Sequence, residues 1–343
     1  MEILRGDSSE TTAATAVPGN DEDVRRNRIR SSKLYLDVIP SKVPLIYSSS
    51  YDICFMGMEK LKLKGFIVEY REVKFGREHL IKYVHSESYL NSLKSSLNVS
   101  VIVEVPPVAL LPNCLVEKCV LSPFRKQVGG TILAAKLAKE RGWAINVGGG
   151  FHHCSANEGG GFCAYADISL CIQFAFIQLN ISRVMIIDLD AHQGNGHEKD
   201  FSSDRRVYIL DMYNPDIYPF DYEARRYINQ KVVVASGTAT NEYLEKLDQA
   251  LEVAAGSFDP ELILYNAGTD ILDGDPLGRL KISPDGISTR DEKVFRFARE
   301  RNIPLVMLTS GGYMKSSARV IADSIINLSQ KSLINTESTT GKI

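Results

Sequence analysis

The feature that most constrains the fold is a series of short, unbroken apolar runs separated by helical segments. These runs lie at 43–47, 143–147, 184–187, 207–210, 262–265 and 304–308. Strands that are buried on both faces of a parallel sheet have continuous apolar sequences rather than alternating ones. The pattern therefore predicts one α/β domain, in which helices cover both faces of a mostly parallel sheet.

The segments between these runs have the periodicity of helices. Ser122-Pro123 opens one helix at the position that favours proline, and Gly142 ends it. Helices are predicted at 123–141, about 168–179, 241–255, 290–301 and 316–329. No linker or repeat divides the chain. We expect a domain at 41–329, between a disordered N-terminal tail at 1–40 and a polar C-terminal tail at 330–343.

Composition excludes several classes of partner. The net charge of −2 leaves no basic surface for nucleic acid or for a membrane. No apolar stretch is long enough to cross a bilayer. The six cysteines form no C-x-x-C pair, which indicates reduced thiols. We therefore expect a protein of the nucleus, the cytoplasm or both, with neither a direct nucleic-acid partner nor a membrane partner.

A cluster of metal-binding residue types follows the apolar run at 184–187. Asp188, Asp190 and His192 are spaced two residues apart, so in extended backbone their side chains project to one side. Ligands of open α/β sheets bind outside the carboxyl ends of the strands. Carboxylate and imidazole donors at such a place suit zinc. The alternative is a strand end with capping aspartates, which the neighbouring loops make less attractive.

Three more strand-ending loops carry reactive groups. His152-His153 follows three glycines, and neutral histidines beside a metal can transfer protons. Asp270 ends another strand and is the best placed third ligand, whereas Asp273 and Asp275 have the sequence context of turn residues. Three protein ligands with one open position are typical of catalytic zinc. Tyr313, after Ser310-Gly311-Gly312, would donate a hydrogen bond to a developing oxyanion.

Five ordered motifs resemble the zinc-dependent histone deacetylase family. They are Gly-Gly-Gly-Phe-His-His (148–153), Gly-Phe-Cys-Ala-Tyr-Ala-Asp (161–167), Asp-Leu-Asp-Ala-His-Gln-Gly-Asn-Gly (188–196), Asn-Ala-Gly-Thr-Asp-Ile-Leu-Asp-Gly-Asp-Pro (266–276) and Ser-Gly-Gly-Tyr (310–313). The resemblance extends over about 41–329. Segments 141–150 and 191–196 resemble the class IV branch, the deacetylase-11 type found in plants.

The resemblance implies the arginase/deacetylase fold, with an eight-stranded parallel sheet between helices, and hydrolysis of N-acyl-lysine in histone or non-histone proteins. It implies one Zn²⁺ held by Asp190, His192 and Asp270, although the same ligands accept ferrous iron. Corepressor proteins are implied as further partners. The catalytic positions carried over are His152, His153, Tyr313, Asp188 and Asn195. The positions carried over for the substrate channel are Gly150, Phe151, Gly161, Phe162 and Gly312.

Further details follow from the resemblance. The opposite channel wall should come from 212–222, where no single residue is assigned. Asp188 and nearby backbone carbonyls resemble part of a monovalent-cation site, such as one for K⁺. Asp188 behind His152 would favour the charged imidazole, whereas Asn195 carries no charge. We therefore predict that His153 is the more nearly neutral base and that His152 is the more cationic of the pair.

The chain departs from the family pattern after Leu61, which runs straight into 62–69. Members of the branch carry a rim loop and a helix there, so an apparent deletion is expected to lower stability and loosen substrate binding. Two alternatives to a protein deacylase stay open. One is an amidohydrolase of small acetylpolyamines, at which Asp216 and Asp221 hint. The other is an inactive scaffold that binds acyl-lysine or corepressors.

Overall fold

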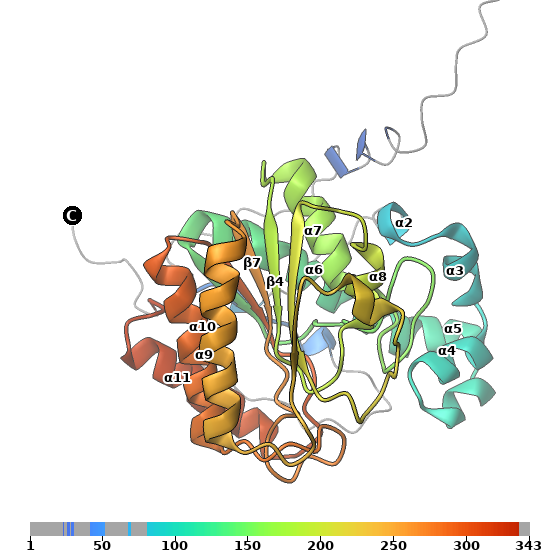
Figure 1. Ribbon diagram of the computed structural model, residues 1–343. Helices are drawn as coiled ribbons and strands as arrows, with labels where there is room; N and C mark the ends of the chain where they lie inside the picture. Colours follow the sequence, from blue (N-terminus) through green and yellow to red (C-terminus); the bar gives the residue numbers. More distant parts are fainter. Residues whose placement is uncertain are drawn as a thin grey trace, which may run out of the picture.

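The computed structural model describes residues 42–51, 68–69 and 81–335, together with 23, 26, 27, 29 and 30. Its centre is a sheet of eight strands in the order β2-β1-β3-β8-β7-β4-β5-β6, and every ladder in it is parallel (Figure 1). The predicted α/β domain with an eight-stranded parallel sheet is thereby confirmed. The strands are β1 (Leu45–Tyr47), β2 (Val68–Glu69), β3 (Trp143–Asn146), β4 (Val184–Asp188), β5 (Val207–Tyr213), β6 (Gln230–Val233), β7 (Leu262–Asn266) and β8 (Leu305–Leu308).

The two strands that the apolar runs did not predict lie at the edges of the sheet. β2 is two residues long and pairs only with β1. β6 alternates between half-buried and exposed positions, because only one side of it faces the core. An edge strand of this kind lacks the continuous apolar run that marks the central strands.

Helices cover both faces of the sheet, as Figure 1 shows. On one face, α6 (Ser122–Arg141) and α7 (Asp167–Gln178) bury their apolar side chains together with Ile186, Leu264 and Val306. On the other face of the sheet, the strand residues that alternate with these pack against a second group of helices. These helices are α9 (Thr240–Ser257), α10 (Pro284–Glu300) and α11 (Ser317–Gln330).

The α10 helix begins at Pro284 rather than at the predicted 290. Ser283 precedes it as the cap, and its hydroxyl accepts a hydrogen bond from the Gly286 N–H at 3.0 Å. Proline suits the first helical position because the N–H that it lacks would have no partner inside the helix. Ser283-Pro284 therefore marks the start of this helix in the sequence, whereas apolar periodicity alone placed the start too late.

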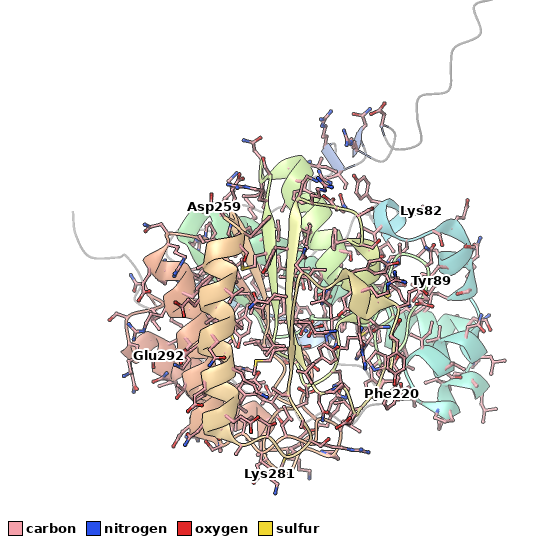
Figure 2. The ribbon with its side chains drawn as sticks, viewed as in Figure 1. Lys82, Tyr89, Phe220, Asp259, Lys281 and Glu292 are labelled. Carbon is pink, nitrogen blue, oxygen red and sulfur yellow. The ribbon has the colours of Figure 1, made fainter. Side chains whose placement is uncertain are left out.

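The short helices α2 (Ile81–Val84), α3 (Glu87–Ser92), α4 (Ser96–Ile102) and α5 (Asn113–Val116) form a lobe at the right of Figure 1. Further short helical elements connect the layers, namely η1 (Ser49–Tyr51), η2 (Pro106–Leu110), η3 (Glu117–Leu121), α8 (Asn195–Asp200) and η4 (Ala224–Tyr227). Tyr89 of α3, labelled in Figure 2, is buried, and its hydroxyl donates to the Ala164 carbonyl at 2.9 Å. This bond joins the lobe to the segment that leads into α7.

The register aligns the carboxyl ends of the central strands. Asp188 at the end of β4 lies level with Asp211 of β5 and with Asn266 at the end of β7. Asn266 in turn lies level with Leu308, and Leu308 with Asn146. The four loops that carry the predicted site residues therefore leave the sheet at one edge, as expected for an α/β ligand site.

The predicted domain limits are partly covered by the described residues. Ile29 is buried although it falls in the expected tail 1–40, and Leu333 and Ile334 are buried beyond the expected domain end at 329. Packing therefore continues to at least Ile334. Most of 1–40, the C-terminal residues from 336 and the junction after Leu61 lie outside the described residues. Across the described ranges, no helix combines the length and apolar character needed to cross a membrane.

Candidate active site

The structure brings Asp190, His192 and Asp270 together, although Asp270 is distant from the other two in sequence. One donor atom from each lies within 4.8 Å of the other two, and all three residues are buried. His192 Nδ1 lies 2.8 Å from Asp270 Oδ2 and 3.1 Å from Asp190 Oδ1. Asp190 follows β4 and Asp270 follows β7, so the neighbouring strands fix their separation.

Two glycines allow neighbouring backbone to press against these carboxylates. A Cβ atom at Gly268 would lie 2.2 Å from Asp190 Oδ2, and one at Gly311 would lie 2.6 Å from the same oxygen. The Gly311 N–H and the Ser310 hydroxyl each donate to Asp190 Oδ2 at 3.0 Å. Glycine is needed at both positions because any side chain would displace the carboxylate.

The electrostatics of this group fit a bound cation. Burial and repulsion from Asp190 raise the pKa of Asp270 to about 7. Burial alone would lower the pKa of His192, but its bonds to the two carboxylates raise it to about 10. Two buried carboxylates facing one imidazole form a site in which a divalent cation relieves the repulsion. The donor set and its burial match a three-ligand Zn²⁺ site.

The two histidines of the glycine-rich loop have different partners. His152 Nδ1 lies 2.9 Å from Asp188 Oδ2, and His153 Nδ1 lies 2.9 Å from Asn195 Oδ1. Burial lowers the pKa of both rings, but the carboxylates of Asp188 and Asp190 outweigh it and raise the pKa of His152 to about 9. The pKa of His153 stays well below its usual value because of burial and the positive neighbours. The directions of these two pKa shifts agree with the prediction that His152 is the more cationic ring and His153 the more nearly neutral one.

Asp188 has more protein partners than the sequence indicated. Its Oδ2 also accepts from His197 Nε2 at 2.8 Å. Its Oδ1 accepts from Asn266 Nδ2 at 3.0 Å and from the Asp190 N–H at 3.2 Å. Both oxygens are thus fully used by protein donors. The predicted part of Asp188 in a K⁺ site, shared with backbone carbonyls of this loop, stays a prediction.

Asp167 holds the loop that carries the two histidines. Its Oδ1 accepts from the Phe151 N–H at 2.7 Å and its Oδ2 from the Gly150 N–H at 2.9 Å. Thr131 Oγ1 donates to the same Oδ2 at 2.7 Å. Asp167 closes the 161–167 motif, but its role was not predicted, since only the fold reveals which loop it contacts.

Aromatic rings line the approach to the histidines. The rings of Phe162 and Tyr313 lie 5.8 Å apart, and Tyr218 packs edge-on against His153 with centroids 4.8 Å apart. Tyr218 is thus the residue from the predicted opposite wall that reaches the site. Figure 2 labels Phe220, which belongs to the same loop and is about half exposed. A Cβ atom at Gly161 would strike the His153 ring.

The remaining predicted positions have structural contacts. Phe151 packs its ring against Phe124, with centroids 5.1 Å apart, so it faces the helix α6. Asp275 was predicted to be a turn residue, and its Oδ1 accepts from the Leu277 N–H at 2.9 Å as such residues do. Its Oδ2 also accepts from the Tyr313 N–H at 2.9 Å, which fixes the tyrosine backbone.

Arg290 is a residue of the site region that sequence reasoning missed. It is fully buried in α10, and its guanidinium donates to the carbonyls of Gly268 at 2.5 Å and Leu189 at 3.4 Å. Its charge is balanced by Asp291 at 2.8 Å. The side chain therefore joins the loops of Asp190 and Asp270 from below. No sequence signal marks it, since arginine on a helix is ordinarily a surface residue.

Comparisons with known proteins agree with this geometry. The chain matches the histone deacetylase domain over residues 50–328. It is 70% identical over 332 residues to histone deacetylase 2 of Arabidopsis thaliana, covering 92% of this chain and 86% of that protein. Among solved structures, its fold resembles an HDAC homolog complexed with SAHA, with a TM-score of 0.64 and 21% identity over 85% of this chain and 84% of the other.

A second solved structure with the same fold is the acetylpolyamine aminohydrolase from Burkholderia pseudomallei. Its TM-score is 0.58 at 19% identity, over 73% of this chain and 82% of the other. Similarity at this level of identity establishes the fold alone. The domain match and the high identity to the plant protein go further. This chain belongs to the histone deacetylase family.

Proposed function

We propose that the protein hydrolyses the side-chain amide of N-acyl-lysine in histones or other proteins. The observation that carries this proposal is the buried group of Asp190, His192 and Asp270, with the two histidines beside it. In a member of the histone deacetylase family, this arrangement supports amide hydrolysis with one Zn²⁺ held by those three residues.

The chain's own residues supply proton transfer and charge stabilisation. When bound, Zn²⁺ supplies a Lewis acid that polarises an acyl oxygen and acidifies water. His153 acts as the base: burial keeps its pKa low and its ring uncharged, and Nδ1, which donates to Asn195 Oδ1, leaves the lone pair on Nε2. His152, kept cationic by Asp188, holds a proton for the departing lysine amine. The Tyr313 hydroxyl donates to the charge that develops on the acyl oxygen.

The aromatic approach to the site suits a lysine side chain. Phe162, Tyr218 and Tyr313 present flat apolar surfaces that can enclose the aliphatic part of lysine. Neutralisation of the amine by acylation removes the penalty of placing it in such a channel. This arrangement favours an extended acyl-lysine over a charged small molecule.

The acetylpolyamine alternative loses part of its support in the structure. Asp221, one of the two acidic residues that suggested a polycation, is paired with Lys199 at 2.7 Å. Asp216 alone remains exposed. An inactive scaffold would have no need for the opposed pKa shifts of His152 and His153.

We further propose class IV membership, from the resemblance of 141–150 and 191–196 to that branch, and with it activity toward acyl groups longer than acetyl. A K⁺ ion, corepressor partners and a nuclear or cytoplasmic location are proposed on the same family grounds. Loss of the rim segment after Leu61 stays a prediction, since that junction lies outside the described residues.

The test is hydrolysis of lysine peptides that carry acyl chains of graded length, with N-acetylated polyamines assayed in parallel. We expect turnover of the peptides, with D190N inactive. Turnover of the polyamines alone would overturn the assignment to proteins. Zinc bound in wild-type protein without any turnover would favour the scaffold.

A further inference from the structure

Asn195 lies between His153 and a third residue, Asp221, that the mechanism has not used. Asn195 Oδ1 lies 2.9 Å from His153 Nδ1, and Asn195 Nδ2 donates to Asp221 Oδ2 at 3.3 Å. His153 and Asn195 are both buried. The three side chains therefore form a chain of hydrogen bonds that runs from the proton-transfer histidine to the loop before η4.

The chemistry of this chain of bonds fixes its direction. An amide has one accepting end and one donating end, and either can face an imidazole. A carboxylate only accepts, so Asp221 binds the NH₂ end of Asn195. The carbonyl end then faces His153, where Nδ1 must carry the proton in order to donate. In the neutral ring this places the lone pair on Nε2.

We propose that Asp221 is a positioning residue that orients the amide of Asn195 and thereby fixes the tautomer of His153. This inference deepens the proposed function, on which it rests, by naming what keeps the base in its working form. Without Asp221 the amide of Asn195 could turn over, and its NH₂ group would face Nδ1 and favour the proton on Nε2. That tautomer cannot accept a proton at Nε2.

Asp221 is itself held on several sides. Lys199 lies 2.7 Å from Oδ2, and the Ala224 N–H donates to Oδ1 at 3.0 Å. The Gln193 amide donates to the Asp221 carbonyl at 3.1 Å. Both the carboxylate and the backbone are therefore placed before substrate binds. These three contacts hold Asp221 in place, and its bond to Asn195 is the one that continues to His153.

The test uses D221S, because serine still accepts from the Ala224 N–H but is too short to reach Asn195. We expect kcat on acyl-lysine peptide to fall by about 10- to 100-fold, with KM within about twofold, as for loss of a tautomer-fixing group. E223Q is the matched control, since it removes one negative charge from an exposed residue two positions along. It should change kcat by less than about twofold.

A double-mutant cycle separates positioning from other effects. In an N195A background His153 has no amide partner, so nothing is left for Asp221 to orient. D221S should therefore change kcat by less than about threefold there. Equal effects of D221S in both backgrounds would overturn the proposal. D221N, of unchanged size, provides a second variant should D221S lower the melting temperature.

A readout that needs no turnover completes the experiment. In protein labelled with ¹⁵N at histidine, with H153Q assigning the signals, wild type should show the proton of His153 on Nδ1. D221S should show a mixture of the two tautomers. The same Nδ1 tautomer in D221S would refute the inference, whatever the substrate. Lack of turnover by wild type would instead refute the proposed function, and the tautomer would still be measured.

Discussion

Substitution of Arg290 by methionine should loosen the two loops that are proposed to hold the metal. The change keeps an unbranched apolar side chain about as long as the aliphatic part of arginine but removes the guanidinium that pairs with Asp291 at 2.8 Å. Asp291 would then be a buried carboxylate supported only by Tyr265 and Ser324 at 2.5 Å each. Breaking a buried ion pair from one side lowers the free energy of unfolding by about 3–5 kcal/mol. That is a large part of the roughly 5–15 kcal/mol typical of a domain.

The same substitution should weaken metal binding. Arg290 donates to the carbonyl of Leu189, which precedes Asp190, and to that of Gly268, which lies two residues before Asp270. Loss of groups that orient metal ligands lowers affinity by about 10- to 100-fold. Urea unfolding would measure the first effect, and competition with a coloured zinc chelator the second.

A control on the same helix distinguishes these effects from loss of any arginine. Arg296 is exposed and pairs with Glu292 at 2.7 Å within one turn of α10. R296M should leave both the urea midpoint and the zinc affinity close to those of wild type. If R290M were as stable as R296M and bound zinc as tightly as wild type, the role given to Arg290 would be wrong.

Three further predictions concern burial and catalysis. Burial lowers the pKa of His85 to about 4. The stabilisation that the uncharged ring gives the fold is therefore complete above pH 6.5 and is lost as pH falls through 4. In urea unfolding, the stability advantage of wild type over H85Q should shrink by about 3 kcal/mol between pH 7 and pH 4. Burial raises the pKa of Asp200 to about 6, so its contribution is present below pH 3.8 and is lost as pH rises through 6. D200N should therefore gain about 2 kcal/mol relative to wild type between pH 4 and 8, and a constant difference would disprove this. Y313F should lower kcat on acetyl-lysine peptide by about 10²–10³-fold, and an unchanged kcat would remove Tyr313 from the mechanism.

The fold was predictable because its central strands are buried on both faces. The runs ending at Asp188 and Asn266 have no polar interruption, and the loops after them carried most of the proposed site. The edge strand β6 was missed, because a strand with one exposed side has an ordinary alternating sequence. The start of α10 was misplaced for a different reason, namely that its cap precedes the apolar periodicity.

Within the site, the residues that sequence reasoning found are those that lie in motifs. Asp167, His197 and Arg290 were missed because their importance depends on contacts made across the fold. From the sequence alone, Arg290 is expected on the surface; only the packing of α10 against the loops of Asp190 and Asp270 shows that it is buried. Tyr218 was confined to 212–222, but its ring could not be placed on His153 without the path of that loop.

The most direct test of the metal site is zinc analysis of purified wild type and D270N, measured together with acyl-lysine hydrolysis. We predict one zinc per wild-type chain, loss of activity on chelation with recovery when zinc is restored, and little zinc or activity in D270N. Equal zinc content in both proteins, or wild-type hydrolysis that survives complete removal of metal, would contradict a site built from Asp190, His192 and Asp270.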